Sequence, residues 1–240
     1  MLNSDAAKKL PLHVGIIMDG NRRWAKNQRL PVSSGHSRGA EVFKNLALYC
    51  NKIGLKNLTV YAFSTENWKR SATEVSALMF LFKKYLKSVM QDFKNENIKL
   101  KFIGDVSKFS SDIQKLINTI ETETKSRTGM RLNIAMNYGS RAEIINAIKN
   151  MQKDIDSPLN KNICDLTEGK FGSYLYTENQ PDVDFLIRTG GEKRISNFLL
   201  WQSAYAELYF ADVLWPDFSE KIFDEAIQEY YNRNRRFGGE

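Results

Sequence analysis

The chain has 240 residues, of which 42% are hydrophobic, and 35 basic residues against 28 acidic ones give a formal net charge of +7. This composition predicts a packed chain rather than a disordered one, and its charge favours anionic partners. Two histidines and two cysteines without a CxxC pair are too few for a structural zinc site or a disulfide framework. No apolar run reaches the ~18 residues of a membrane-spanning helix, and residues 1–11 do not resemble a secretory signal. We therefore expect a cytoplasmic protein, with any membrane contact peripheral at the inner face.

Strand-like apolar runs alternate with helical patterns along the chain. Strands are predicted at residues 13–19, 57–64, 98–104, 131–138, 183–188 and 207–210, and helices near 36–52, 73–95, 110–126, 140–154 and 219–233. Such alternation indicates an α/β fold with a mainly parallel central sheet of about six strands, flanked by helices. No linker or repeat interrupts it, so residues 1–240 are interpreted as a single domain, with a flexible segment at 1–11 and a tail at 232–240.

Charged residues follow the first predicted strand, where the sequence reads Asp19-Gly20-Asn21-Arg22-Arg23-Trp24. In parallel α/β sheets, ligands bind at the carboxyl ends of the strands. A carboxylate there suits Mg²⁺, and the free N–H groups of a helix start suit a phosphate. Asp19 could equally cap the following helix. This hexapeptide alone does not distinguish the two interpretations.

A comparable cluster, Ser64-Thr65-Glu66-Asn67-Trp68-Lys69-Arg70, follows the second predicted strand. The next helix, near 73–90, carries apolar side chains over most of its circumference. This pattern is typical either of a central core helix or of one wall of an apolar cavity.

A third cluster spans residues 188–197, after the strand predicted at 183–188. Arg188 and Arg194 can hold phosphate oxygens in a bidentate manner. Ser196 is expected to cap a helix at 198–205. Each cluster alone also fits a solvated loop, but three at strand ends favour a phosphate site. The absence of GxxxxGK[ST] and GxGxxG argues against a nucleotide cofactor.

The motifs at 19–25, 35–36, 61–68, 137–139, 188–198 and 207–210 resemble, in order and spacing, those of the cis-prenyltransferases, the undecaprenyl (di-trans, poly-cis) diphosphate synthase family. The resemblance implies an apolar tunnel with a charged mouth. It also implies an enzyme that condenses isopentenyl diphosphate onto an allylic diphosphate, with farnesyl diphosphate as the expected starter. The product would be a polyprenyl diphosphate such as undecaprenyl diphosphate, the lipid-carrier precursor for cell-wall glycans.

The same resemblance implies residue roles. Asp19 and Asn67 are the catalytic residues, and Asp19 and Glu207 are the ligands of Mg²⁺. The allylic diphosphate would be held by Gly20, Asn21, Arg22 and Arg23, with His36 beside it. Isopentenyl diphosphate would be held by Arg188, Arg194 and Ser196. Ser64, Arg70 and Trp68 would lie around the reacting carbons, and the further substrate-binding positions are Trp24, Thr65 and Glu66. The family implies a homodimer, in which Arg236-Phe237-Gly238 of one chain reaches towards the partner's site.

The chain departs from the family pattern at a few positions. Val32 stands where many relatives carry a diphosphate-binding arginine, and Arg29 is our candidate to replace it. Met130 and Met136 are expected on the strand that lines the far part of the tunnel, where their bulk would shorten the product.

Three other functions fit parts of the pattern: a phosphohydrolase that uses Asp19, a nucleic-acid-binding module and an inactive partner subunit. The apolar helix and the many arginines favour prenyl transfer over hydrolysis. The basic residues cluster at strand ends and the tail rather than along one helix, so we expect no nucleic-acid partner. The presence of Asp19, Asn21, Arg188 and Arg194 argues against an inactive subunit. The acceptor of the proton lost after condensation stays open among released diphosphate, Asp19 and the region of Ser64 and Asn67.

Overall fold

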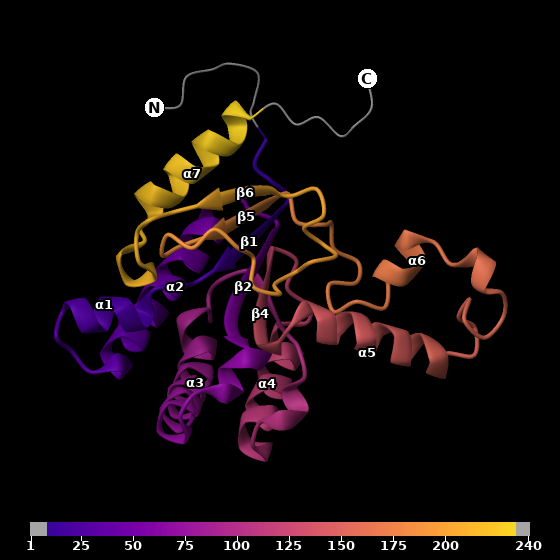
Figure 1. The fold of residues 1–240 in the computed structure, drawn as a ribbon, viewed down its shortest axis with the longest axis horizontal. Helices are drawn as coiled ribbons and strands as arrows, with labels where there is room; N and C mark the ends of the chain where they lie inside the picture. The colour runs from indigo at the N-terminus through magenta and orange to yellow at the C-terminus, as the bar shows by residue number, and fades with distance from the viewer. Residues whose placement is uncertain (1–8, 234–240) are drawn as a thin grey trace.

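The computed structural model describes residues 9–233, which are built around a six-stranded, entirely parallel sheet (Figure 1). Its strand order is β3-β4-β2-β1-β5-β6. The strands are β1 (His13–Ile17), β2 (Asn57–Ser64), β3 (Ile98–Ile103), β4 (Met130–Tyr138), β5 (Phe185–Arg188) and β6 (Glu207–Phe210). The predicted α/β class and strand number are thus confirmed.

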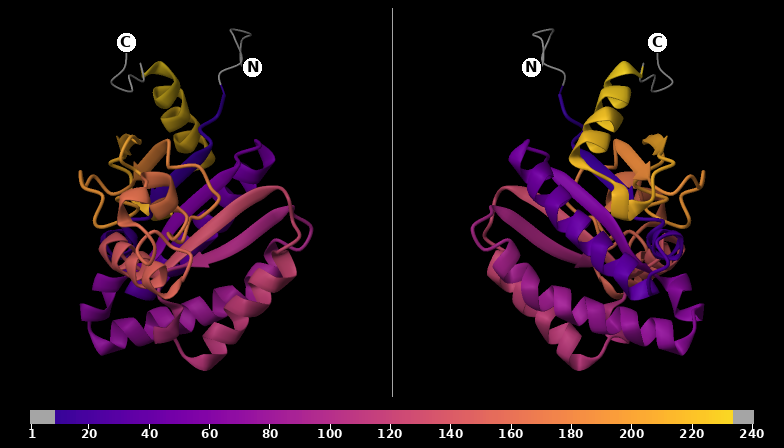
Figure 2. Two further views of the ribbon diagram at one scale, coloured as in Figure 1. Left: turned by 90° about the vertical axis from the view of Figure 1, so that its right-hand side faces the viewer. Right: turned by 90° about the vertical axis from the view of Figure 1, so that its left-hand side faces the viewer.

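The α-helices are α1 (Asn21–Asn27), α2 (Val32–Lys52), α3 (Ala72–Asp92), α4 (Ser111–Thr124), α5 (Ser140–Lys153), α6 (Glu168–Gly172) and α7 (Glu220–Asn232). Short 3₁₀ helices are η1 (Thr65–Lys69), η2 (Val106–Lys108), η3 (Ile163–Asp165) and η4 (Trp215–Asp217). Side chains of α2, α3, α4 and α7 share one large apolar core with the sheet, and the views in Figure 2 show α3 and α4 packed below it. A smaller apolar cluster covers other strand side chains and includes Phe198 and Leu199.

Burial of both sheet faces explains why the strands read as near-continuous apolar runs. All five residues of β1 are buried, and in β4 only Arg131 is partly exposed. Parallel pairing aligns the carboxyl ends of β1, β2 and β5, because Ile17 is level with Tyr61 on one side and Arg188 on the other. The segments that follow these three strands therefore meet at one edge.

Two glycines allow α2 to lie against the first turn of α1. A Cβ at Gly35 would overlap the carbonyl oxygen of Asn21, and one at Gly39 would overlap the Asn21 side chain. Close backbone contact of this kind admits only glycine. It fixes Asn21 between β1 and α2.

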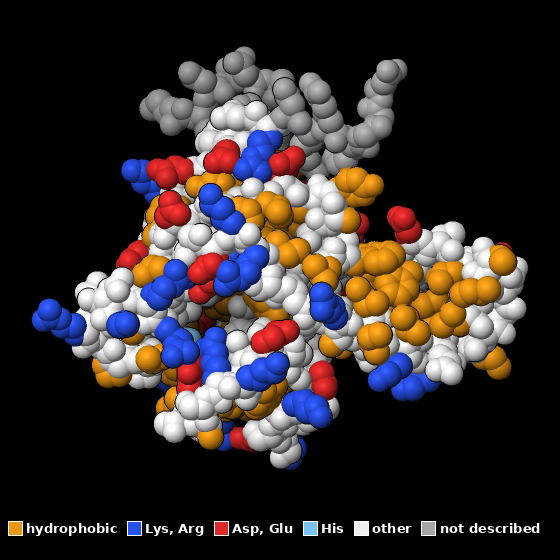
Figure 3. Space-filling view, in the orientation of Figure 1, with side chains coloured by type: hydrophobic (Ala, Val, Ile, Leu, Met, Phe, Trp, Pro, Cys, Tyr) orange, Lys and Arg blue, Asp and Glu red, His pale blue; other side chains and the backbone are white. Residues whose placement is uncertain are grey.

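The helices α5 and α6 extend from the body as an arm (Figure 1), with their own small apolar cluster around Met151 and Phe171. Ile145, Ile148 and Ile155 are exposed on α5 and just after it. Figure 3 shows an extended apolar surface over this arm.

The prediction of a helix at 198–205 was wrong: these residues form turns before β6. Ser196, Asn197 and Leu199 have positive φ angles of 47°, 62° and 47°, which a right-handed helix excludes. The apolar side chains that suggested a helix are instead buried individually, as at Phe198. In addition, α2 begins at Val32 rather than near residue 36, and α6 was not predicted.

Within residues 9–233, no helix combines the length and the apolar character needed to cross a bilayer. Most of the predicted segments at 1–11 and 232–240, including Arg236-Phe237-Gly238, lie outside the described residues. Of the first segment, Pro11 is buried.

Candidate functional site

Asp19 lies two residues beyond the end of β1, and its side chain is 32% exposed. Gly20 occupies the N-cap of α1 with a φ of 118°, and no side chain caps this helix. The interpretation of Asp19 as a helix cap is therefore wrong. Its carboxylate stays available at the sheet edge, as a ligand-binding role requires.

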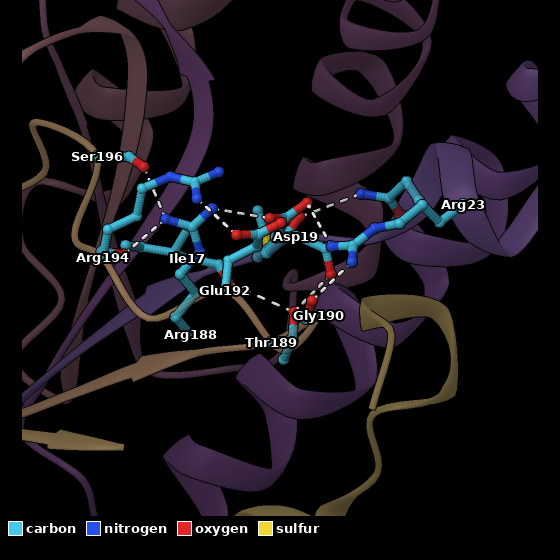
Figure 4. Close-up of polar contacts among 11 residues, drawn as sticks. Ile17, Asp19, Arg23, Arg188, Thr189, Gly190, Glu192, Arg194 and Ser196 are labelled. Atoms are coloured by element: carbon cyan, nitrogen blue, oxygen red, sulfur yellow. Dashed lines mark hydrogen bonds and ion pairs between the residues drawn. The ribbon is translucent and has the colours of Figure 1, made fainter. Parts of the chain in front are cut away.

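Asp19 is held beside Arg188, the last residue of β5 (Figure 4). Nη2 of Arg188 donates to Oδ2 of Asp19 at 2.9 Å. Nη1 of Arg188 donates to Oγ of Ser196 and to the carbonyl oxygen of Arg194, both at 2.6 Å. The Arg188 side chain is only 5% exposed, so these acceptors fix one orientation of its guanidinium.

A second arginine approaches Asp19 from α1. Nη2 of Arg23 lies 3.4 Å from Oδ1 of Asp19, and its Nη1 donates to the carbonyl oxygen of Gly190 at 2.7 Å. The hydroxyl of Thr189 donates to the carbonyl oxygen of Asp19 at 2.7 Å. These contacts tie the segment after β5 to the segment after β1.

Arg194 extends from the loop after β5 with a 61% exposed side chain, and its Nη1 donates to Glu192. Its guanidinium appears near that of Arg188 in Figure 4. Since solvent screens exposed ion pairs, the contact with Glu192 is weak enough to exchange for an anionic ligand.

The cluster after β2 is ordered by its own hydrogen bonds. Ser64 and Asn67 form a reciprocal cap on η1, in which the backbone N–H of Ser64 donates to Oδ1 of Asn67 at 3.0 Å. Arg70 donates to Glu74 at 2.9 Å, and Arg22 lies 3.4 Å from the other oxygen of Glu74. Glu74 thereby joins α1 to the start of α3.

Three buried polar atoms in this region have no hydrogen-bond partner among the described residues: Oδ1 of Asn21, Nε2 of His36 and Nε of Arg188. All three residues line the main cavity. Burial and the neighbouring Arg70 lower the pKa of His36 from 6.5 to about 4, although Glu74 opposes the shift. His36 is therefore a neutral imidazole at pH 7, and the unpartnered atoms are available for a ligand.

The main cavity has a volume of about 820 Å³ and joins this charged region to an apolar interior. At its polar end lie Asp19, Asn67 and Arg188. Its apolar lining comes mainly from α3 and the sheet, and includes Leu78, Leu81, Phe82, Leu86, Val89, Phe102, Ile134 and Met136. The helix α3 thus forms a wall of this cavity, while Leu78, Leu86 and Val89 also belong to the apolar core. Met130 is buried on β4 but does not line this cavity, contrary to the prediction.

The predicted site residues other than Trp24 and Glu207 fall into three groups. Asp19, Asn21, His36, Ser64, Glu66, Asn67, Arg70, Arg188 and Ser196 line the main cavity. Gly20, Arg22, Arg23 and Arg194 lie beside it through the contacts described above. Thr65 and Trp68 face a second cavity of about 980 Å³, where Nε1 of Trp68 donates to Asn137. Trp24 lines neither cavity, and its Nε1 donates to Asp217.

Glu207 is not brought to Asp19 within this chain. It pairs in register with Phe185 at the start of β5, three residues before Arg188, which is ~10 Å along the strand. Its carboxylate accepts a hydrogen bond from Arg233 at 3.0 Å. Arg29 is exposed in the α1–α2 connection, and Val32 begins α2.

Sequence reasoning missed the contacts of Glu74, Thr189 and Asn197. Their partners are distant in sequence or, as for Arg70 and Glu74, lie one helix turn away. The one local signal was Asn197, because asparagine tolerates a left-handed backbone better than most residues.

Within residues 9–233, no group of three or more His, Cys, Asp or Glu side chains could hold a metal ion by itself. The half-buried Asp19 nevertheless fits Mg²⁺, which typically binds one or two carboxylates together with phosphate oxygens. Each carboxylate oxygen has two lone pairs, so the bonds to Arg188 and Arg23 leave acceptor capacity.

Known proteins resemble this chain over nearly its whole length. The family model described as "Putative undecaprenyl diphosphate synthase" matches residues 17–238. The chain is 51% identical to the ditrans,polycis-undecaprenyl-diphosphate synthase ((2E,6E)-farnesyl-diphosphate specific) of Haemophilus ducreyi, over 96% of this chain and 95% of that protein. It is 50% identical to an isoprenyl transferase of Fusobacterium nucleatum, with 97% of each covered. The crystal structure of lavandulyl diphosphate synthase from Lavandula x intermedia with dimethylallyl diphosphate matches with a TM-score of 0.91 and 34% identity, covering 96% of this chain and 99% of that one.

Proposed function

Because the chain belongs to the undecaprenyl diphosphate synthase family of cis-prenyltransferases, we propose that it condenses isopentenyl diphosphate units onto farnesyl diphosphate to give undecaprenyl diphosphate. The observation that carries this proposal is that Asp19, Arg188 and the apolar wall of α3 line one and the same cavity. A diphosphate needs the charged end, and a growing hydrocarbon needs the apolar end.

Two anion-binding regions flank Asp19 and suit two diphosphates. Gly20, Asn21, Arg22 and Arg23 would hold the allylic diphosphate at the start of α1, with neutral His36 donating or accepting a hydrogen bond beside it. Arg188, Arg194 and Ser196 would hold isopentenyl diphosphate on the other side. This assignment places the two reacting groups near Ser64, Asn67 and Arg70, which line the same cavity.

The arginines would stabilise the negative charge that develops on the diphosphate as the allylic C–O bond breaks. The resulting allylic cation must be attacked by the double bond of isopentenyl diphosphate and not by water. The apolar lining of the cavity provides that exclusion. Loss of one proton then completes the new double bond, and diphosphate, Asp19 and the Ser64–Asn67 cap remain the candidate acceptors.

We propose Mg²⁺ as the metal, held by Asp19 with the substrate diphosphate. When bound, it would neutralise diphosphate charge and act as a Lewis acid. The role of Glu207 as a second Mg²⁺ ligand remains a proposal. Within one chain, Glu207 lies at the opposite end of β5 from Asp19, and this separation does not favour a shared ion.

The exposed isoleucines of the α5–α6 arm support the proposal of a homodimer, since contiguous exposed apolar surface marks interaction sites. A second copy of the chain is the expected partner. Peripheral contact with a membrane during product release remains part of the proposal.

The direct test is to incubate the protein with labelled isopentenyl diphosphate, farnesyl diphosphate and Mg²⁺ and to size the extracted lipid. We expect a polyprenyl ladder that ends near eleven isoprene units in total and disappears when farnesyl diphosphate is omitted. Release of inorganic phosphate without any lengthened product would instead identify a phosphohydrolase.

A further inference from the structure

The loop between β5 and β6 adopts an unusual backbone at the point where it contacts Arg188. Ser196, Asn197 and Leu199 all have left-handed φ angles, and none is glycine. Such residues cost of order 1 kcal/mol each and persist only where the surroundings hold them. The question is what holds this loop in place.

Asn197 binds the first residues of α5. Its carbonyl oxygen accepts a hydrogen bond from the N–H of Ser140 at 2.8 Å, and its Oδ1 accepts one from the N–H of Arg141 at 2.9 Å. These N–H groups lack partners within the helix. The hydroxyl of Ser140 completes the contact by accepting from the N–H of Leu200 at 3.0 Å.

The same side chain reaches η1 on the other side of the site. Nδ2 of Asn197 donates to Oε1 of Glu66 at 3.2 Å. Burial alone would raise the pKa of Glu66, but its backbone and side-chain hydrogen bonds, including the one from Asn197, lower that pKa below 4.5. Glu66 is therefore a carboxylate at neutral pH. It directly precedes Asn67 in the cavity wall.

We propose that Asn197 is a positioning residue for the isopentenyl diphosphate site. By joining α5 to Glu66, it fixes the loop so that the Ser196 hydroxyl and the Arg194 carbonyl stay on the Arg188 guanidinium. Both of these acceptors lie within three residues of Asn197 and 2.6 Å from Nη1 of Arg188. This inference rests on the proposed function and adds to it the element that keeps the second anion-binding region assembled.

The test uses Asn197→Asp, which removes the hydrogen bond to Glu66 and keeps the acceptor for α5. An aspartate keeps the acceptor for the N–H of Arg141, where a negative charge at a helix start is favourable. Its other oxygen would face the Glu66 carboxylate, and like charges in contact repel. We expect the KM for isopentenyl diphosphate to rise about tenfold, because the loop is displaced, with a smaller change in the KM for farnesyl diphosphate.

A second substitution separates positioning from a general loss of structure. In Asn197→Asp/Glu66→Gln, the glutamine amide can donate to the new aspartate and restore the link with its direction reversed. The KM for isopentenyl diphosphate should return to that of Glu66→Gln alone, where Asn197 can still donate to the glutamine oxygen. Asn160→Asp is the matched control: it makes the same charge change in the α5–α6 connection, where Nδ2 of Asn160 donates to Gln152 and Asp154. It should leave both KM values unchanged.

The proposal is overturned if Asn197→Asp has a wild-type KM for isopentenyl diphosphate, or if Glu66→Gln fails to restore it. A purely structural role would lower the melting temperature and the active fraction without changing this KM. Absence of any condensation by the unmodified protein would instead remove the proposed function itself.

Discussion

Oδ2 of Asp19 and Nη2 of Arg188 lie 2.9 Å apart and so join the segments that end two neighbouring parallel strands, β1 and β5. The arginine is almost fully buried, whereas the carboxylate is about one-third exposed. The pair therefore has a fixed cationic half and an accessible anionic half. This asymmetry suits a site in which the carboxylate meets a metal and the guanidinium meets a diphosphate.

Substitutions of Asp19 should separate its charge from its hydrogen bond. Asp19→Asn retains an oxygen that can accept from Arg188, and Asp19→Ala does not. We expect both variants to lose at least ~100-fold in kcat, because the charged ligand is gone in each. The melting temperature should fall clearly only for Asp19→Ala, which leaves a buried guanidinium short of one acceptor. Near-normal turnover of Asp19→Asn would contradict the assigned role.

Arg194→Ala should mainly raise the KM for isopentenyl diphosphate. Its side chain is exposed, and its ion pair within residues 9–233 is with Glu192, so the fold should be unaffected. Loss of one charge-assisted hydrogen bond, about 1.5–3 kcal/mol, corresponds to an increase of roughly tenfold to a hundredfold. Lys193→Ala removes the neighbouring exposed charge and serves as the control. An unchanged KM with a reduced kcat would argue for a role in the chemical step.

His36 should produce a pH-dependent stability difference but no titration of activity near neutrality. Its pKa is about 4 in the folded chain and 6.5 ordinarily. Above pH 6.5, neither the folded nor the unfolded state binds the proton. Between pH 6.5 and about 4, the unfolded state binds it and the folded state does not, so stability decreases as the pH falls. Urea unfolding across this window should show a shallower pH dependence for His36→Gln than for the unmodified protein. An equal slope for the two proteins would show that the imidazole is not buried as described.

Two methionines on β4 form a matched pair for testing the cavity. Both are buried, but Met136 lines the cavity and Met130 does not. Met136→Ala removes three heavy atoms and frees ~75 Å³, at about 25 Å³ per heavy atom. This volume is smaller than the roughly 125 Å³ that one five-carbon unit occupies on the same scale. Sizing the products should show a shift towards longer chains, by up to about one unit. Met130→Ala should destabilise the protein without altering product length. A shift of equal size in both variants would mean that overall loosening, and not the cavity wall, sets the length.

The sheet was predictable because β1, β2, β4 and β5 are mostly buried apolar runs and helices separate the strands from β1 to β5 along the chain. The resemblance located the residues around Asp19 and Arg188. The loop after β5 was not predictable from local sequence. Its apolar residues 198–201 resemble a helix, but Phe198 is stacked on Tyr61 and Asn197 is bonded to α5 and η1. These contacts come from elements more than 50 residues earlier, and they override the local helical preference. For the same reason, the contacts of Glu74 with Arg22 and Thr189 with Asp19 became visible only in the structure.

The cavity is too small for the complete hydrocarbon of the proposed product. A 150 Å³ cavity accommodates benzene, or about 25 Å³ per carbon, so 820 Å³ holds roughly 30 carbons, whereas an undecaprenyl tail has about 55. Later additions therefore require either separation of α2 from α3 or a tail that extends beyond the enclosed space. Those two helices are bridged by the Lys44–Asp92 ion pair at 2.6 Å and by the Tyr85 hydroxyl, which donates to the Ser37 carbonyl at 3.3 Å. Solvent-accessible contacts of this kind contribute at most about 1 kcal/mol each, while burying one further isoprene unit yields about 4 kcal/mol. Burial of the lengthening product therefore offsets the loss of these two polar contacts.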